Sequence, residues 1–190
     1  MVISSINNKS LSRTDNEITK HQKKIFISGT DLLTGEQHID WLVKGVIEKD
    51  SIGEEKIPAS ALYGIHSLRA KRNFPDTDFE QHDNYFIRAY LLVKKAALSA
   101  CQTVGLLEKE THAWLDRAIE YLLEHNEVVA ANLIVPVTQG GAGTSLNMNL
   151  NELIANQTLL LMGKKPGEYT VIHPLDTVNL CQSTNDTYPT

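Results

Sequence analysis

The sequence lacks the features of several large protein classes. It has two cysteines, 6% aromatic residues, and no apolar run of the ~18 residues that a membrane-spanning helix needs. Its 18 basic residues against 23 acidic ones give a net charge of −5, which excludes a broadly basic nucleic-acid-binding protein. The N-terminus has no continuous apolar segment typical of a secretory signal, and Cys101 and Cys181 fit free thiols in a reducing compartment. We therefore predict a cytoplasmic protein without membrane or nucleic-acid partners.

Short motifs that define common catalytic centres are also missing. The seven histidines show neither HExxH nor another metal-ligand spacing, and no GxSxG, Walker GK[ST] or GxGxxG segment occurs. From the residues alone we predict no metal site and no bound cofactor.

The apolar spacing predicts a mainly α fold with short extended segments. Helices are expected over 84–105, 108–125 and 146–163, and Gly105 and Gly163 are typical residues for ending the first and the last. Residues 1–24 are polar and expected to be poorly ordered, whereas residues 25–27 are strand-like. The first of these helices is expected to bury an apolar face formed by Phe86, Tyr90, Val93, Ala97, Ala100 and Val104. One further helical face is expected, formed by Ile39, Leu42, Val43 and Val46.

The first segment that could form a binding or catalytic site is QGGAGTSLNMNLNE, residues 139–152. Its glycines allow close backbone approach, and the helix that follows offers free N–H groups for a carboxylate or phosphate. Thr144 adds a hydroxyl, and Asn147 and Asn151 lie one turn apart on one face. The same asparagines could instead bond to each other or to the backbone between packed helices.

The second segment is QSTNDTYPT, residues 182–190, where hydroxyl and amide side chains gather at a predicted helix start. Ser183 and Asp186 have the spacing of a capping box, so the segment either binds a carboxylate or simply caps the helix. A helix that begins so close to Thr190 also leads us to expect that the chain was cut from a longer one.

Two other positions allow both a functional and a structural interpretation. Arg69, three residues after His66, could bind a carboxylate through two hydrogen bonds, or form an ordinary surface ion pair. His173 stands alone before a proline, which is more typical of a structural residue than of a catalytic one.

Taken together, the segments IPASALYGIHSLRAKRNF, QGGAGTSLNMNLNELIAN and IHPLDTVNLCQSTNDTYPT resemble the aspartase/fumarase superfamily over about residues 47–190. Class II fumarases typically read GSGTQSNMN and SSND, so GAGTSLNMN and STND are closer to the aspartate ammonia-lyases. The resemblance implies an extension over 1–46, partly disordered, the lyase N-terminal domain over 47–182, and the start of a truncated central domain at 183–190. The central helical bundle itself would be lacking.

The resemblance also implies roles for individual residues. Thr144, Ser183 and Thr184 would bind the β-carboxylate of L-aspartate, Asn185 would contact its amino group, and Asn147 would belong to the same wall. These positions are implied by residue matching alone. The catalytic base of the family is a serine on a glycine-rich loop with the signature GSSxMPxKxN, which does not occur in this chain.

His173 matches the histidine of a second, non-catalytic anion site of fumarases, although its neighbours differ. No cofactor is implied, but divalent cations activate some aspartases, and members of the family are homotetramers.

We therefore expect the N-terminal part of an aspartate ammonia-lyase that converts L-aspartate to fumarate and ammonia by anti elimination, and expect the isolated chain to be inactive. Two alternatives remain: a fumarase-like or other fumarate-producing lyase, and a naturally short, non-catalytic partner of a full-length lyase.

Overall fold

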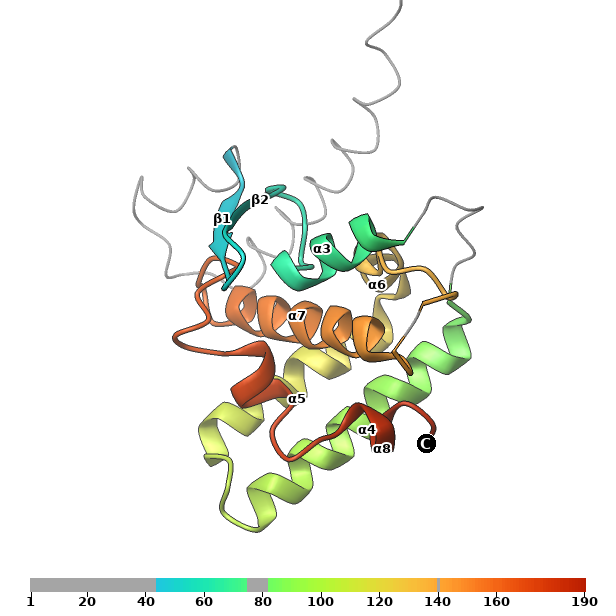
Figure 1. Ribbon diagram of the computed structural model, residues 1–190. Helices are drawn as coiled ribbons and strands as arrows, with labels where there is room; N and C mark the ends of the chain where they lie inside the picture. Colours follow the sequence, from blue (N-terminus) through green and yellow to red (C-terminus); the bar gives the residue numbers. More distant parts are fainter. Residues whose placement is uncertain (1–43, 75–81, 140) are drawn as a thin grey trace, which may run out of the picture.

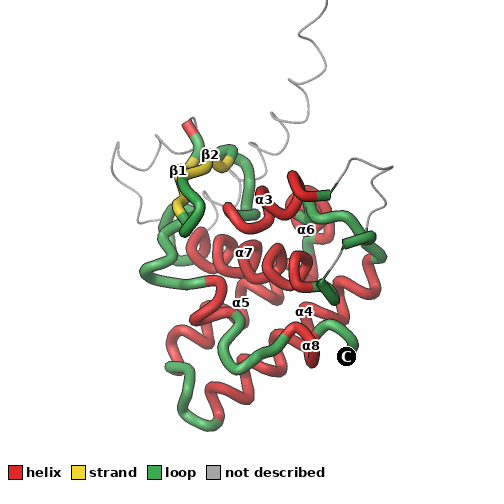
Figure 2. The backbone as a smooth tube through the Cα atoms, viewed as in Figure 1, coloured by secondary structure: helices red, strands yellow, loops and turns green. Residues whose placement is uncertain are grey.

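The computed structural model describes residues 44–74, 82–139 and 141–190, and confirms a mainly helical fold (Figures 1 and 2). Helix α7 crosses the centre of the molecule and has α3 on one side. Helix α5 and the π-helical turn η2 also pack against α7. A two-stranded hairpin lies beside α3, and α4 packs on α5. The elements are β1 (Val46–Lys49), β2 (Glu54–Ile57), α3 (Ile65–Asn73), α4 (Asn84–Thr103), α5 (Lys109–Glu124), α6 (Asn126–Asn132), α7 (Thr144–Leu161), η2 (Pro174–Val178) and α8 (Thr184–Thr187).

Helix α7 is buried on all sides over most of its length, which explains why its sequence shows little amphipathic contrast. Its apolar residues, such as Leu150 and Ile154, form the main core with α4 and α5. Its asparagines are equally buried and bond to neighbouring segments. Asn149 accepts a hydrogen bond from the backbone N–H of Ile134 at 2.9 Å and donates one to the carbonyl of Asn132 at 2.9 Å. These polar side chains therefore position the segment that leads into α7.

The apolar face predicted for α4 is wrong, although the helix itself is found at the expected place. Phe86 and Val104 are 36% and 69% exposed, and the buried face consists of Ile87, Tyr90, Leu91, Lys94, Leu98 and Cys101. Because a lysine occupies the middle of the buried face, a search for apolar spacing selects the neighbouring stripe. Part of that stripe lines a groove of about 150 Å³ against Tyr188 and Pro189.

The helical face predicted through Val46 is also wrong at that residue, which begins strand β1. Gly45 has φ of +79°, and an added Cβ would lie 2.3 Å from the carbonyl oxygen of Ile57, so only glycine fits where the chain enters the hairpin. The strands are antiparallel, with Val46 opposite Ile57 and Lys49 opposite Glu54. The expectations for residues 1–43, namely the polar extension, the strand-like run at 25–27 and the rest of the helical face, lie outside the described residues.

The helix expected over 108–125 is α5, and the one expected over 146–163 is α7, which begins two residues earlier. Gly105 and Gly163 both have the positive φ expected of residues that follow a helix. Within the described part of the chain, no helix is both long and apolar enough to cross a membrane.

Candidate functional site

The start of α7 is a tight, glycine-containing turn. Residues 141–143 all have positive φ, including Ala142, and Gly143 is the N-cap. The exposed Thr144 donates its hydroxyl to the carbonyl of Gly141 at 2.7 Å. The side-chain oxygen of Gln139 accepts a hydrogen bond from the N–H of Leu146 at 2.7 Å, which satisfies one of the free N–H groups of the helix. Sequence reasoning missed Gln139, although it lies at the start of the motif.

The second predicted segment forms the short helix α8. Ser183 is its N-cap, as the capping-box spacing predicts, and its Oγ accepts a hydrogen bond from the N–H of Asn185 at 3.3 Å. The side chains of Ser183 and Asn185 are exposed and that of Thr184 is half-buried. Pro189 follows the helix, which ends at Thr187.

The structure brings these two segments together through two tyrosines. The Tyr90 hydroxyl donates to Asn147 Oδ1 at 2.9 Å and lies 3.3 Å from the hydroxyl of Thr187 in α8. Tyr188 packs edge-on against Tyr90, with ring centroids 6.0 Å apart, and an added Cβ at Gly143 would lie 2.1 Å from the Tyr188 ring. The start of α7 and helix α8 are therefore in direct contact.

Asn147 is only 2% exposed, and both polar atoms of its amide have partners. Besides the bond from Tyr90, its Nδ2 donates to Asn179 Oδ1 at 3.1 Å, and Asn151 Nδ2 donates to the same oxygen at 3.2 Å. This arrangement matches the interpretation of asparagine bonding between packed segments. The place of Asn147 in the wall of a substrate site stays a prediction.

Lys94 lies next to this asparagine cluster and is fully buried. Its Nζ contacts the side-chain oxygens of Gln182 at 3.2 Å and Asn179 at 3.4 Å, and lies 5.3 Å from the centre of the Tyr90 ring. Burial lowers the pKa of Lys94 to about 7. A buried lysine therefore contacts the turn that leads to Ser183 through Asn179 and Gln182, and no motif in the sequence indicates it.

The segment around His66 and Arg69 forms helix α3, whose start is held by a carboxylate of α7. Glu152 accepts hydrogen bonds from the N–H groups of Gly64, His66 and Ser67 at 2.8, 2.9 and 3.1 Å, and from the Ser67 hydroxyl. Burial raises the pKa of Glu152. The carboxylate therefore does for α3 what an N-cap residue does in other helices.

Glu48 from β1 holds the same helix start. It accepts a hydrogen bond from the N–H of Ile65 at 2.8 Å and another from the Tyr169 hydroxyl at 2.9 Å. Burial raises its pKa to about 7.

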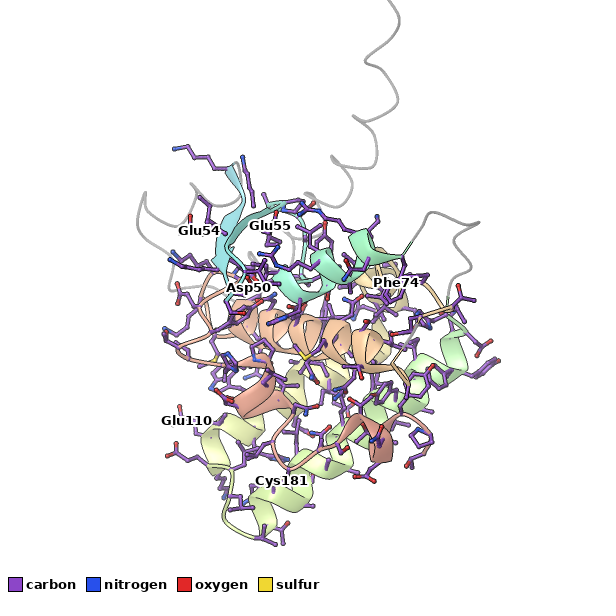
Figure 3. All side chains as sticks on the ribbon, in the orientation of Figure 1. Asp50, Glu54, Glu55, Phe74, Glu110 and Cys181 are labelled. Carbon is purple, nitrogen blue, oxygen red and sulfur yellow. The ribbon has the colours of Figure 1, made fainter. Side chains whose placement is uncertain are left out.

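Arg69 binds a carboxylate of the chain itself. Its Nε and Nη2 donate to the two oxygens of Asp50 at 2.6 and 2.9 Å, and Nη1 donates to Glu55 at 3.3 Å. Hydrogen bonds from Arg69 lower the pKa of Asp50 to about 2. Figure 3 shows Asp50 and Glu55 on the hairpin beside α3, so this arginine ties the hairpin to the helix.

His173 has a structural role in the described chain. Its Nδ1 accepts hydrogen bonds from the N–H groups of Leu175 and Asp176 at 3.2 and 3.1 Å, which caps the turn η2. The side chain also lines a cavity of about 290 Å³ together with Glu48 and His66. A second anion site at His173 stays a prediction. Among the described residues, no group of three His, Cys, Asp or Glu side chains is placed to hold a metal ion.

Comparison with known proteins places the chain in a family. A family model described as "Lyase" matches residues 53–190, which is more than half of the chain. The chain belongs to this lyase family, the aspartase/fumarase superfamily. It is 46% identical over 146 residues to an aspartate ammonia-lyase of Bacillus sp., and 43% identical over 145 residues to that of Escherichia coli strain K12.

Each of these alignments covers 76% of the chain and 30% of the relative, so the chain spans about a third of the length of the proteins it matches. Among solved structures, a fumarate lyase:delta crystallin from Brucella melitensis superposes with a TM-score of 0.70 at 41% identity, and covers 76% of this chain and 32% of that one. A class II fumarase from Schistosoma mansoni superposes with a TM-score of 0.69 at 25% identity, and covers 76% and 30%.

Proposed function

We propose that the chain supplies the carboxylate-binding part of an aspartate ammonia-lyase, which eliminates ammonia from L-aspartate to give fumarate. The observation that carries this proposal is the contact between the two predicted binding segments. Thr144 at the start of α7 and Ser183 at the start of α8 belong to segments that meet at Tyr90 and Tyr188. The names of the relatives at 43–46% identity support the choice of L-aspartate.

The chemistry of the reaction favours the residue types found here. Removal of a proton from C3 of aspartate places nearly two negative charges on the β-carboxylate group. Hydroxyl donors fixed around that group stabilise it as it forms, and each such donor contributes roughly 3–4 kcal/mol in comparable oxyanion sites. We assign this role to Thr144, Ser183 and Thr184, and contact with the leaving amino group to Asn185.

The proton transfer itself needs a base, and none of the described residues in these two segments is assigned that role. By resemblance it is a serine beyond residue 190, so the isolated chain is expected to be inactive. We further propose that the whole protein acts in the cytoplasm as a homotetramer. Residues 47–182 would form its N-terminal domain, and residues 183–190 would begin the helical domain that completes the site.

A chimera tests the proposed reaction. The matched 146 residues of the Bacillus sp. relative are replaced by the corresponding residues of this chain, and the purified protein is offered L-aspartate or fumarate plus water. The proposal predicts release of fumarate and ammonia from L-aspartate, with no activity for the 190-residue chain alone. Hydration of fumarate without ammonia release would instead favour the fumarase-like alternative, and turnover by the isolated chain would contradict its expected inactivity.

A further inference from the structure

The two cysteines lie far apart in the sequence but close together in the fold. Cys101 is in the last turns of α4, where it is 5% exposed, and Cys181 is an exposed residue on the segment between η2 and α8 (Figure 3). The Cys101 Sγ lies 3.6 Å from the carbonyl oxygen of Leu180, the residue directly before Cys181. Both cysteines are free.

This contact limits the distance between the two residues. The carbonyl oxygen of Leu180 and the Cα of Cys181 belong to one planar peptide unit, in which they are about 2.8 Å apart. The Cys101 Sγ is therefore within roughly 6.4 Å of the Cys181 Cα, so rotation of the Cys181 side chain about χ1 can direct its sulfur toward Cys101. Burial raises the pKa of the Cys101 thiol, and the neighbouring Cys181 thiol raises it further.

The turn that carries Cys181 is held in place by its own hydrogen bonds. Asn179 Nδ2 donates to the carbonyl of Gln182 at 2.9 Å, and Gln182 Nε2 donates to the carbonyl of Val178 at 2.8 Å. Cys181 itself has φ of +55°, in the left-handed region that a cysteine rarely adopts. The turn thus keeps Cys181 beside α4 in a conformation that its own side chain does not favour.

We propose that Cys101 and Cys181 form a peroxide-sensitive dithiol that closes to an intramolecular disulfide. The exposed Cys181 thiolate attacks one oxygen of hydrogen peroxide, the O–O bond breaks, and the leaving hydroxide takes up a proton to become water. The thiol of Cys101 then attacks the sulfur of the resulting sulfenic acid, forms the S–S bond, and releases a second water that carries the Cys101 proton. The two thiols are oxidised by two electrons, and one peroxide is reduced to two waters.

The disulfide would link the end of α4 to the turn two residues before Ser183. Because that turn leads into α8, the oxidation state of the two cysteines becomes coupled to the segment that we assign to carboxylate binding. The cysteine chemistry does not depend on that assignment and can be tested on the 190-residue chain.

The test treats the purified chain with hydrogen peroxide, blocks remaining thiols with N-ethylmaleimide under denaturing conditions, and maps peptides without reduction. The proposal predicts a cross-linked pair of peptides containing Cys101 and Cys181, lighter by two hydrogen atoms, in a monomeric protein. Dithiothreitol should restore both thiols, and the oxidised chain should unfold at a higher urea concentration.

Two outcomes would overturn the proposal: Cys181 oxidised to sulfinic acid while Cys101 stays alkylatable, or chains joined to each other through Cys181. Cys101→Ser should leave Cys181 open to sulfenic and sulfinic acid, and Cys181→Ser should leave Cys101 as a protected thiol. The main result comes from the unmutated chain, so it does not depend on how well either variant folds.

Discussion

The buried side chain of Lys94 makes the stability of the fold depend on pH. A lysine in water has a pKa near 10.5, and burial lowers that of Lys94 to about 7. Between these values the unfolded chain binds more protons at this site than the folded chain does. The free energy of unfolding therefore rises with pH across this window, and the full penalty for burying the charge applies below about pH 7.

Replacing Lys94 by methionine removes this penalty. At pH 6 we expect K94M to be more stable than the unmutated chain by roughly 2–3 kcal/mol, because a shift of one pKa unit corresponds to about 1.36 kcal/mol and some hydrogen bonding is lost. The advantage should shrink as the pH approaches 9.5. Urea unfolding followed by circular dichroism at both values measures it, with the exposed Lys165→Met as control. An equal difference between K94M and the unmutated chain at both pH values would show that Lys94 does not titrate in this window.

For individual residues, the sequence predicted a role that depends on local spacing, but it did not predict the burial of Lys94, which depends on packing between distant segments. The capping role of Ser183 follows from its spacing to Asp186 and is confirmed. The burial of Lys94 has a weak signal, since it stands four residues after Tyr90 and four before Leu98, both buried. Its partners Asn179 and Gln182 come from a distant segment, and no local pattern reveals them.

Among the elements, α3 depends on another part of the chain for the hydrogen bonds at its start. Its first N–H groups are bonded to Glu152 of α7, which accepts from Gly64, His66 and Ser67. Glu152→Ala would leave the buried N–H groups of Gly64 and Ser67 and the part-buried one of His66 without this partner, so we expect a loss of about 3 kcal/mol or more in the free energy of unfolding. Glu110→Ala is the matched control, because Glu110 lies exposed in the first turn of α5 (Figure 3) and its loss should cost little. Similar urea midpoints for the two variants would contradict this account of α3.

The contact between α7 and α8 can be tested with a pair of glycines. Gly143 and Gly105 have similar φ values of +82° and +78°, but an added Cβ meets the Tyr188 ring at Gly143 and nothing within 4 Å at Gly105. Gly105→Ala should cost only the left-handed backbone penalty, about 1–2 kcal/mol. Gly143→Ala should cost roughly 1–3 kcal/mol more, because the tyrosine must move, and near-ultraviolet circular dichroism should change. Equal losses in the two variants would mean that Tyr188 does not pack on the start of α7.

The positions of the long helices were predictable from the sequence, with glycines marking the ends of α4 and α7, although the buried face of α4 was not. The hairpin and α3 were not predictable. Strands β1 and β2 have four residues each, too few for a clear alternation, and Ile47 on β1 is 70% exposed. Helix α3 owes its start to Glu48 and Glu152, which precede and follow it at a distance in the sequence. Elements that are stabilised by remote residues leave little trace in their own sequence.

At the scale of the whole molecule, buried polar side chains link the two segments that we assign to carboxylate binding. Interior asparagines, Lys94 and two tyrosines connect the start of α7 to the turn before α8, and keep the exposed Thr144 and Ser183 on neighbouring segments. The resemblance of both segments to the aspartase/fumarase superfamily could be predicted from the sequence, and family membership is confirmed. The roles of individual residues stay predictions, because the alignment covers only 30% of the relative.

The most direct test of the central claim is the ammonia-lyase activity of the chimera with single substitutions at the proposed carboxylate donors. Thr144→Val, Ser183→Ala and Thr184→Val should each lower kcat/KM for L-aspartate by about 10²–10³, since each removes one donor from the developing charge. Thr103→Val, an exposed hydroxyl at the far end of α4, should leave the rate unchanged. A chimera whose activity on L-aspartate survives all three substitutions would contradict the assignment of these segments to carboxylate binding.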